Sequence, residues 1–455
     1  MFKKTASRRD FLRTAALTAV GLSAAACAPA SPAAAPTKAA DSGAAPASGE
    51  KQKVTLSMWT HDNLYVQFFT ARANEWAANY PQYEFTFDFQ QVPEVFTKML
   101  SSLSAGEPVP DLFGLEQGWF GPFMKDGILD SKFVDLTPFV MAEKDKFVEN
   151  NWSKFTADGK IFGVDSSLCA CAFYYQSVVL EKIGLSELSK TWEDFMVVGE
   201  KAAEQGIYLS ALDGEGSGIF ELLFLQRGGE FFSKDNSFVL GEEANKKIAI
   251  EVLAYLQQGV EKKVFWPATG ADFWGAGLMA AHKEGKVMGV PGADWWSDFI
   301  LKANAKDQSG NWKIELLPKW SGGGHVSSTW GGTGFGITKS SQNAQLAWEL
   351  LHYAYMTKEN QIKRYTEIKY FPHMIEALND PAVVKVRDAF YADQEVGQVW
   401  AEAAKDMPLM YQSPVRRDMQ TELGTQCTNV FAGKQTPEAA IDAVIAITDQ
   451  AIKDL

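Results

Sequence analysis

The residues best suited to hold a ligand in this sequence are its 14 tryptophans, many of which lie in turn-like stretches beside Gly, Asp, Glu or His. An indole face packs against the C–H face of a sugar ring, whose hydroxyls need planar polar partners. Any one tryptophan could equally fill the core, because tryptophan is largely buried in most proteins. Their clustering favours a binding site. The tryptophans in such stretches are Trp59, Trp119, Trp274, Trp295, Trp296, Trp320 and Trp330.

Motifs that would indicate catalysis are incomplete. The glycine-rich stretch 331–339 (GGTGFGITK) carries Ile337 where a phosphate-binding loop needs lysine, so we interpret it as a tight turn. Asp213 and Glu215 could form a general acid–base pair, but such a pair arises easily by chance among 56 acidic residues. The 5 histidines show no zinc-binding spacing. We therefore expect no enzyme, no metal site and no cofactor.

The charge of the chain argues against a nucleic-acid partner. The formal net charge is −13, and the first 27 residues carry five basic groups and one acidic group, so the remainder carries −17. Phosphate binding requires clustered Lys and Arg, which an acidic surface does not provide. Beyond the N-terminal region, no apolar segment is long enough to span a membrane.

The cysteines are too few for a disulfide framework. Outside the N-terminal region only Cys169, Cys171 and Cys427 are present. The spacing of Cys169 and Cys171 matches one face of a strand, and we expect all of them to be small buried apolar residues. A bridge from Cys427 to either of the others stays an alternative.

Hydrophobic periodicity predicts an α/β organisation. Residues 54–59 form an expected strand, Asn63 is expected to cap a helix, and residues 83–89 alternate as a strand with one buried face. A second helix up to Gly106 and a strand at 111–115 follow. Strands joined by crossover helices pair in parallel, and ligands collect at the carboxyl ends of such strands.

Later segments continue this pattern. Residues 158–165 and 169–176 are expected β segments. Helices are predicted after Thr191 and Thr436, whose hydroxyls can accept a hydrogen bond from a free N–H of the first turn.

The first residues predict export and anchoring. Residues 7–12 (SRRDFL) match the twin-arginine export signal, and the apolar run 15–26 is too short to span a bilayer alone. Cys27 follows three alanines, as a lipidated cysteine does at a lipoprotein cleavage site. We interpret residues 1–26 as a signal peptide and 27–52 as a lipidated cysteine with a disordered Ala/Pro/Ser tether. An ordinary signal peptide is the alternative.

From residue 53 to the C-terminus, the order of motifs resembles the extracellular solute-binding proteins of the maltose-binding type (family 1), which serve ATP-driven carbohydrate importers. The resemblance rests on several degenerate segments in the right order. They include PDLFGLEQGWFG, DGKIFGVD followed by FYYQ and TWEDF, FWGAGLMAAHKEGKVMGVPGADWW, LLPKWSGGG, GGTGFGITK, YFPHMIEALNDPAV and GKQTPEAAI.

This resemblance implies an α/β fold of two lobes, each a sheet flanked by helices, with the ligand in the cleft between them. Lobe I would comprise residues 53–168 and 333–373, and lobe II residues 169–332 and 374–455. The three crossings between the lobes would lie near 168–172, 332–334 and 371–374.

Carried over by position, the resemblance also implies ligand contacts. The loop after the first strand would contribute Trp59, His61 and Asp62, the loop after the third strand Glu116, Gln117 and Trp119, and a second-lobe loop Asp294, Trp295 and Trp296. Asp165 replaces the usual proline and would place a carboxylate at the cleft, or else form a solvated turn. Asp213, Trp274 and Trp330 are candidates from their own residue types.

The expected function is capture of a neutral sugar or oligosaccharide by closure of the lobes, for delivery to the membrane permease of an ABC importer. An anionic ligand would require an arginine or a helix N-terminus in the cleft, whereas the candidate stretches offer carboxylates and indoles. We expect a monomer at the extracytoplasmic face of the cell membrane. The alternatives are a non-sugar solute bound by the same fold, or a surface polysaccharide hydrolase.

Overall fold

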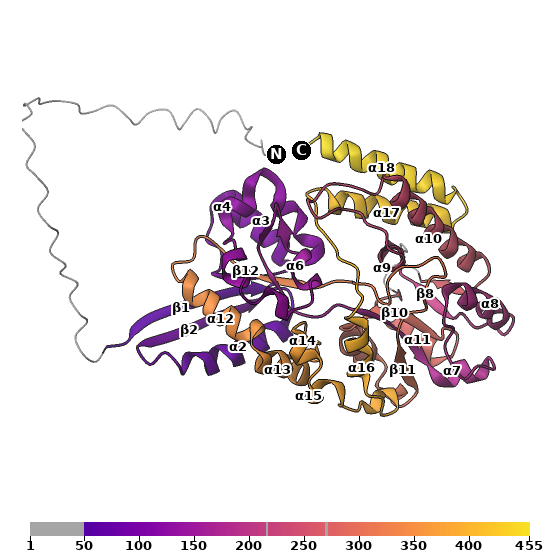
Figure 1. The fold of residues 1–455 in the computed structure, drawn as a ribbon, viewed down its shortest axis with the longest axis horizontal. Helices are drawn as coiled ribbons and strands as arrows, with labels where there is room; N and C mark the ends of the chain where they lie inside the picture. Colours follow the sequence, from indigo (N-terminus) through magenta and orange to yellow (C-terminus); the bar gives the residue numbers. More distant parts are fainter. Residues whose placement is uncertain (1–49, 215–216, 269–271) are drawn as a thin grey trace, which may run out of the picture. The chain divides into compact units, whose positions relative to one another are not determined.

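A computed structural model describes residues 50–214, 217–268 and 272–455 of the chain (Figure 1). The export signal, Cys27, most of the tether and Glu215 lie outside the described residues, so the expectations for them are not addressed by the structure. Residues 51–455 form one unit by their internal contacts. Within the described ranges, no helix has both the length and the apolar character needed to cross a membrane.

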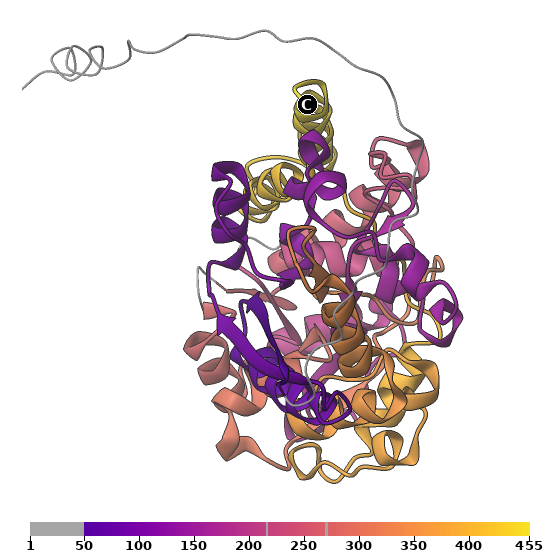
Figure 2. The ribbon, with the colours of Figure 1, turned by 90° about the vertical axis from the view of Figure 1, so that its left-hand side faces the viewer.

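The first sheet has five strands in the order β2-β1-β3-β12-β6. Strand β1 pairs in parallel with β2 and β3, as the alternation of strands and helices predicts, while β12 pairs antiparallel with β3 and β6. Its strands are β1 (Gln52–Thr60), β2 (Tyr83–Gln91), β3 (Leu112–Glu116), β6 (Val164–Asp165) and β12 (Thr333–Ile337). We call this sheet with its helices the five-stranded half, and Figure 2 views it with β1 and β2 in front.

Helices of the five-stranded half come from both ends of the sequence. Helix α12 contacts α2 and β12, and α13 contacts α2. Their bounds are α2 (Asn63–Ala77), α3 (Val95–Ala105), α4 (Ile128–Lys132), α5 (Thr137–Val140), α6 (Asn150–Ser153), α12 (Ala344–Met356) and α13 (Lys358–Ile368), with a small hairpin of β4 (Thr156–Ala157) and β5 (Lys160–Ile161).

The second sheet has three antiparallel strands in the order β10-β7-β11, and a parallel pair β8-β9 lies beside it. We call this the three-stranded half. Its strands are β7 (Cys171–Gln176), β8 (Ser210–Leu212), β9 (Phe265–Pro267), β10 (Gly289–Ala293) and β11 (Trp312–Glu315). Its helices are α7 (Ser177–Lys182), α8 (Trp192–Ala203), α9 (Ser217–Gln226), α10 (Glu243–Glu261), α11 (Ala276–Lys283), α14 (Ile375–Leu378), α15 (Pro381–Val384), α16 (Val396–Ala403), α17 (Arg416–Phe431) and α18 (Pro437–Lys453).

The two halves have separate hydrophobic cores. Leu56, Met58 and Phe335 belong to the core of the five-stranded half, whereas Tyr174 and Leu253 belong to that of the three-stranded half. The chain passes from one sheet to the other between β6 and β7, between β11 and β12, and again after α13.

Backbone hydrogen bonds tie these connecting segments together. The N–H of Ser166 donates to the carbonyl of Thr333 (2.9 Å), and the N–H of Leu168 donates to the carbonyl of Phe371 (3.2 Å). Segments that are far apart in sequence therefore lie side by side where the halves meet.

The predicted N-terminal caps were confirmed at two helices, and the cap predicted for a third helix was wrong by one residue. The hydroxyls of Thr191 and Thr436 accept hydrogen bonds from the N–H groups of Asp194 and Ala439, as predicted. Helix α2 is capped by Asp62 and not by Asn63, because the Asp62 backbone is extended and its carboxylate accepts from the N–H of Leu64 (2.9 Å).

The aromatic residues of β2 are less buried than predicted. Tyr83, Phe85, Phe87 and Phe89 alternate with exposed residues as expected, but each is only half-buried. The reason is topological, because β2 lies at the edge of the sheet, where no strand of the described residues pairs with its outer side. Cys169, Cys171 and Cys427 are buried free thiols, which agrees with their interpretation as small core residues.

Candidate ligand-binding site

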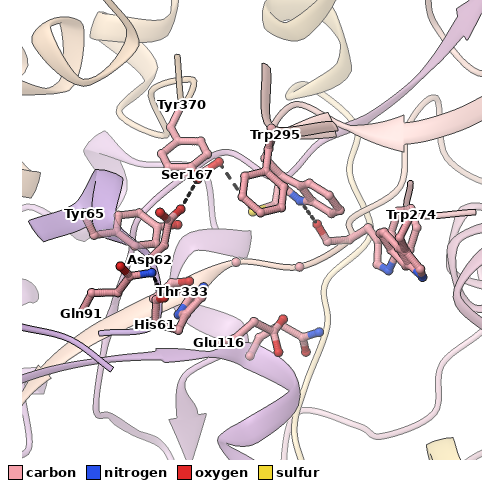
Figure 3. Close-up of a pocket in the computed structure, with 16 residues that line it drawn as sticks. His61, Asp62, Tyr65, Gln91, Glu116, Ser167, Trp274, Trp295, Thr333 and Tyr370 are labelled. Carbon is pink, nitrogen blue, oxygen red and sulfur yellow. Dashed lines mark hydrogen bonds between the residues drawn. The ribbon is translucent and has the colours of Figure 1, made fainter. Parts of the chain in front are cut away.

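A cavity of about 420 Å³ lies between the two halves, beyond the carboxyl ends of β1 and β3. Its size falls in the range of small-ligand sites, about 300–1,000 Å³. Figure 3 draws the 16 lining residues, with Tyr65, Tyr370 and Asp62 on one side, Trp295 and Trp274 on the other, and Glu116 below. The lining residues are His61, Asp62, Tyr65, Gln91, Glu116, Gln117, Ser167, Cys169, Trp274, Trp295, Phe299, Trp330, Gly331, Gly332, Thr333 and Tyr370.

The structure brings together about half of the residues that the sequence singled out. His61, Asp62, Glu116, Gln117, Trp274, Trp295 and Trp330 line the cavity. The lining does not include Trp59, Trp119, Asp165, Asp213, Asp294 or Trp296.

The wall from the five-stranded half is polar and held by its own hydrogen bonds. Asp62 caps α2 with one carboxylate oxygen and accepts from the hydroxyl of Tyr370 with the other (2.9 Å). The ring of Tyr370 stacks on Tyr65, with centroids 5.3 Å apart, and the Tyr65 hydroxyl shares a hydrogen bond with the Ser166 hydroxyl (2.8 Å). We call His61, Asp62, Tyr65 and Tyr370 the polar wall.

His61 adds a neutral imidazole to the polar wall. Burial lowers its pKa, and the opposing effect of the Asp62 charge is smaller. The ring packs edge-on against Tyr65 and Trp119, with centroids 5.8 and 5.4 Å apart, so Trp119 supports His61. Its Nδ1 atom is buried and has no hydrogen-bond partner within the described residues.

Glu116 offers a carboxyl group of mixed protonation at the bottom of the cavity. It is the last residue of β3, and its carboxylate accepts a hydrogen bond from the N–H of Gly118 (2.6 Å). Burial raises its pKa to about 7, although that hydrogen bond and the charge of Arg416 act in the opposite direction. Near neutral pH, Glu116 can therefore either accept or donate a hydrogen bond.

The wall from the three-stranded half is aromatic. Trp295 and Trp330 lie 5.5 Å apart between ring centroids, and the indole N–H of Trp295 donates to the carbonyl of Trp330 (2.9 Å). Trp274 lies nearly parallel to Trp295, with ring planes 17° apart. Trp296 contacts all of these rings from inside the core, where it is fully buried. We call Trp274, Trp295, Trp330 and Phe299 the aromatic wall.

Asp294 connects the two walls from behind. Its fully buried carboxylate accepts hydrogen bonds from the hydroxyl of Ser167 (2.8 Å) and from the backbone N–H groups of Cys169 (3.1 Å), Trp295 (3.0 Å) and Phe371 (3.3 Å). Burial raises the pKa of Asp294 to about 6. One carboxylate therefore joins the segment that carries Trp295 to connecting segments between the halves.

Asp165 is neither at the cavity nor in a solvated turn. It is fully buried and forms an ion pair with Lys154, which is also fully buried. A side chain at Gly332 would bring Cβ within 2.8 Å of the Lys154 Nζ atom and 2.9 Å of the Asp165 carboxylate. The positive φ angles of Gly331 and Gly332, 79° and 118°, let this turn pass over the ion pair and form part of the cavity lining.

Asp213 and Trp59 make structural contacts away from the cavity. The carboxylate of Asp213 accepts from the N–H groups of Gly218 (3.0 Å) and Ile219 (3.1 Å) at the start of α9. The ring of Trp59 packs under the Lys98 ammonium, 3.7 Å from the ring centroid. Neither residue lines the cavity.

Sequence reasoning missed Tyr65, Tyr370, Phe299 and Ser167. Two of these carried a usable signal, because Tyr65 lies on the first turn of the helix that Asp62 caps and Phe299 follows Trp295 by one turn. Tyr370 directly precedes the third expected crossing. Hydropathy alone could not place it at the cavity.

Among the described residues, the lining of the cavity contains acids and amides but no lysine or arginine. Among the residues that the structure describes, no group of His, Cys, Asp and Glu side chains is arranged to hold a metal ion. The cavity therefore combines flat apolar surfaces with a few oriented hydrogen-bonding groups, without a fixed positive charge.

Comparisons with known proteins agree with this architecture. The chain is 27% identical to the arabinooligosaccharide-binding protein of Bacillus subtilis (strain 168) over 71% of this chain and 74% of the relative. It is 24% identical to the lactose-binding protein of Rhizobium radiobacter over 87% and 92%. Its fold is similar to that of the sugar-binding protein MalE from Xanthomonas citri (TM-score 0.72, 16% identity, 88% of this chain and 98% of that chain).

The fold is also similar to that of a cyclic α-maltosyl-1,6-maltose binding protein from Arthrobacter globiformis (TM-score 0.71, 17% identity, 89% of this chain and 100% of that chain). These likenesses confirm the two-lobe, maltose-binding-like fold class. The family model described as bacterial extracellular solute-binding protein matches residues 71–390. The chain therefore belongs to the bacterial extracellular solute-binding proteins.

Proposed function

We propose that this protein captures an uncharged saccharide in the cavity between its halves and delivers it to an ABC importer. The observation that carries the proposal is the pairing of a polar wall with an aromatic wall around a cavity whose described lining residues include no lysine or arginine. Sugar rings present apolar C–H faces to indoles and hydroxyls to carboxylates. The binding proteins for arabinooligosaccharides and lactose to which the chain is similar support the same class of ligand.

Capture would proceed by closure of the halves. A saccharide that contacts one wall is stabilised further when the second wall reaches it, so the closed form is favoured by the difference in affinity between the states. The separate cores and the connecting segments between the sheets support the two lobes at residues 53–168 with 333–373 and 169–332 with 374–455.

Release of the saccharide unaltered is part of the proposal. A polysaccharide hydrolase needs two carboxyl groups on either side of the scissile bond, about 5–10 Å apart. At this cavity the Asp62 oxygens already hold the N–H of Leu64 and the hydroxyl of Tyr370. Incubating the protein with oligosaccharides and analysing the products by chromatography tests this point, and any cleavage would contradict it.

Export and anchoring are proposed from the sequence. A twin-arginine signal at residues 7–12 and a lipid on Cys27 would place the folded protein, as a monomer on its tether, beside the membrane permease of the importer. Replacing Cys27 by Ser should release the protein from the membrane fraction, whereas the Arg8→Lys/Arg9→Lys pair should block export. Retention of Cys27→Ser in membranes would contradict the lipid anchor.

A thermal-shift screen followed by calorimetry tests the binding function. The protein is titrated with neutral mono- and oligosaccharides, including arabino-, galacto- and malto-oligosaccharides, and with uronic acids as charged controls. A ligand at one hundred times its dissociation constant should stabilise the protein by about 2.7 kcal/mol. Stabilisation by uronic acids without any response to neutral saccharides would contradict the proposal.

A further inference from the structure

The start of helix α17, in the three-stranded half, reaches across to the five-stranded half. The guanidinium of Arg417 lies over the ring of Phe96 in α3, 5.0 Å from its centroid. A carboxylate oxygen of the neighbouring Asp418 lies 4.0 Å from the Lys125 ammonium, in a 3₁₀ segment downstream of β3. None of these residues belongs to the described lining of the cavity. We call Arg417 and Asp418 with Phe96 and Lys125 the α17 clasp.

Two adjacent arginines of α17 face different halves. Arg416 is fully buried and forms an ion pair with Glu221 of α9, in its own half. The side-chain amide of Gln420 donates a further hydrogen bond to the same carboxylate (3.0 Å). Arg417 is exposed and contacts the other half. Because a satisfied buried network is rigid, it holds the start of α17 in place and so presents Arg417 to Phe96.

A row of aromatic rings connects the clasp to the polar wall. Phe96 packs against Trp119, with ring centroids 6.4 Å apart, and Trp119 packs edge-on against His61, with centroids 5.4 Å apart. Just before α17, the side-chain amide of Gln412 donates to the Oε1 atom of Gln117 (3.0 Å), and Gln117 lines the cavity. Movement of the start of α17 relative to the five-stranded half would therefore displace groups that line the cavity.

The contacts of the clasp are weak enough to break when the halves separate. An exposed cation over an aromatic ring, or a surface ion pair, changes an equilibrium constant by only about two- to fivefold. Arg417 and Asp418 are both exposed, so neither fills the core of its half. The clasp can therefore be lost without unfolding either half, and its contribution belongs to the closed arrangement alone.

We propose that the α17 clasp holds the two halves closed, and that Arg417 is the positioning residue that sets how long a bound saccharide is retained. This inference rests on the proposed function, in which capture occurs by closure of the halves. A contact that exists only in the closed form raises the closed fraction and lowers the apparent dissociation constant by the same factor. Because the clasp forms after the ligand has entered, it slows dissociation and not association.

The first measurement needs no ligand. Spin labels at Glu107→Cys and Lys434→Cys, exposed positions in the two halves, report the distance between the halves by pulsed electron paramagnetic resonance. The background is Cys27→Ser, and the thiols of the described residues are buried. Arg417→Ala should raise the ratio of open to closed form about two- to fivefold. Arg387→Ala is the matched control, because that arginine is exposed and its ion pair (3.7 Å) lies within the three-stranded half.

The second measurement follows saccharide binding by stopped flow, with arabinotriose and maltotriose as the first probes and any neutral saccharide found in the thermal-shift screen. In Arg417→Ala the dissociation rate should rise about two- to fivefold, while the association rate stays within about twofold. Arg417→Lys keeps a cation over the ring and should recover most of the loss. Urea denaturation should give Arg417→Ala the stability of the wild type, because the side chain is exposed.

A double-mutant cycle tests whether the two halves act through this contact. Phe96→Leu should raise the dissociation rate as Arg417→Ala does, and the double variant should be no worse than either single variant, because both remove the same contact. If Phe96→Leu does not fold, the comparison of Arg417→Ala with Arg417→Lys carries the test.

Three outcomes would overturn the clasp. The first is an unchanged distance distribution in Arg417→Ala, the second is an equal effect of Arg387→Ala, and the third is additive effects of Arg417→Ala and Phe96→Leu. A failure of every neutral saccharide to bind would refute the proposed function. The spin-label comparison would still decide whether the clasp holds the halves together.

Discussion

The two walls of the cavity differ in how their side chains are held. In the polar wall, the carboxylate of Asp62 accepts hydrogen bonds from the N–H of Leu64 and the hydroxyl of Tyr370. The hydroxyl of Tyr65 shares a hydrogen bond with that of Ser166, so the orientation of these side chains is fixed before a ligand arrives. In the aromatic wall, flat rings lie on a buried tryptophan and are directed mainly by packing. The polar wall is suited to recognise hydroxyl positions, and the aromatic wall to supply contact area whatever the stereochemistry of the sugar.

The largest effect, on the free energy of unfolding, is expected for Asp294, whose carboxylate joins the two walls. Burial raises the pKa of Asp294 to about 6 from its ordinary value of 3.8, so the folded protein holds this proton more tightly than the unfolded chain. The stabilisation from that proton is present below about pH 4 and is lost as the pH rises to about 6, with a magnitude of ~3 kcal/mol. Asp294→Asn removes this titration.

Urea denaturation at several pH values measures the effect. The free energy of unfolding of the wild type relative to Asp294→Asn should fall between about pH 4 and pH 6 and be constant on either side. The variant should also bind its ligand about tenfold more weakly, because an amide cannot accept every hydrogen bond that the carboxylate accepts. A pH-independent difference in stability would refute this role of the carboxylate.

Truncation of the aromatic wall should have the next largest effect. Trp295 packs against both cores and supports Trp274 and Trp330. Trp295→Ala should weaken saccharide binding about 100-fold, or ~2.7 kcal/mol, as measured by calorimetry. Trp295→Phe should recover most of the affinity, and Trp348→Phe, in the core of the five-stranded half, should leave it unchanged. Equal losses in the alanine and phenylalanine variants would argue against stacking.

Disruption of the polar wall should lower the affinity less than truncation of Trp295 does. It should also lower the stability of the protein. Asp62→Ala removes the cap of α2, which is worth about 1 kcal/mol, and the acceptor for the Tyr370 hydroxyl. Binding should weaken about tenfold. Asp62→Asn keeps a capping oxygen and should retain the stability of the wild type in thermal denaturation. If Asp62→Asn is as unstable as Asp62→Ala, the charge and not the cap is responsible.

A smaller effect is expected for Tyr370→Phe. The substitution removes only the hydroxyl that donates to Asp62 and keeps the ring stacked on Tyr65. A loss of about 1 kcal/mol, or roughly fivefold in affinity, corresponds to one hydrogen bond. A hundredfold loss would show that the hydroxyl itself contacts the ligand.

The smallest effect on the dissociation constant should come from a change in salt concentration. The proposed ligand is uncharged, and in the part of the chain that the structure describes no lysine or arginine lines the cavity. Raising the salt concentration from about 0.05 to about 0.5 M should therefore change the dissociation constant less than twofold. A steep loss of affinity with salt would point to an anionic ligand and to a contribution from charges outside the lining.

The sequence predicted the first sheet better than it predicted which side chains face the cavity. Alternating strands and helices are local signals, and the parallel pairing of β1 with β2 and β3 followed from them. Trp295 and Trp296 are neighbours with the same chemistry, yet only Trp295 lines the cavity while Trp296 is fully buried. Which of two adjacent residues faces a ligand depends on how the loop packs, and the local sequence pattern does not predict this packing.

Buried acids show a second limit of sequence reasoning. The resemblance implied that Asp294 contacts the ligand, and that Asp165 lies at the cleft or else in a solvated turn. Their partners, Lys154 for Asp165 and Ser167 with Phe371 for Asp294, lie on other segments of the chain. Because tertiary contacts compensate the cost of burial, only the folded structure shows that these carboxylates support the site from behind.

The close packing of Trp274, Trp295, Trp296 and Trp330 gives the protein an intrinsic optical reporter. With centroids 5.5–6.5 Å apart, these indoles are near enough to exchange excitation energy. Trp274 is the most exposed of them, so its fluorescence should be that of a solvent-exposed indole as long as no ligand covers it. Occupation of the cavity should therefore register as a blue shift in the emission of the unlabelled protein, so that rates of opening and closing can be followed in real time.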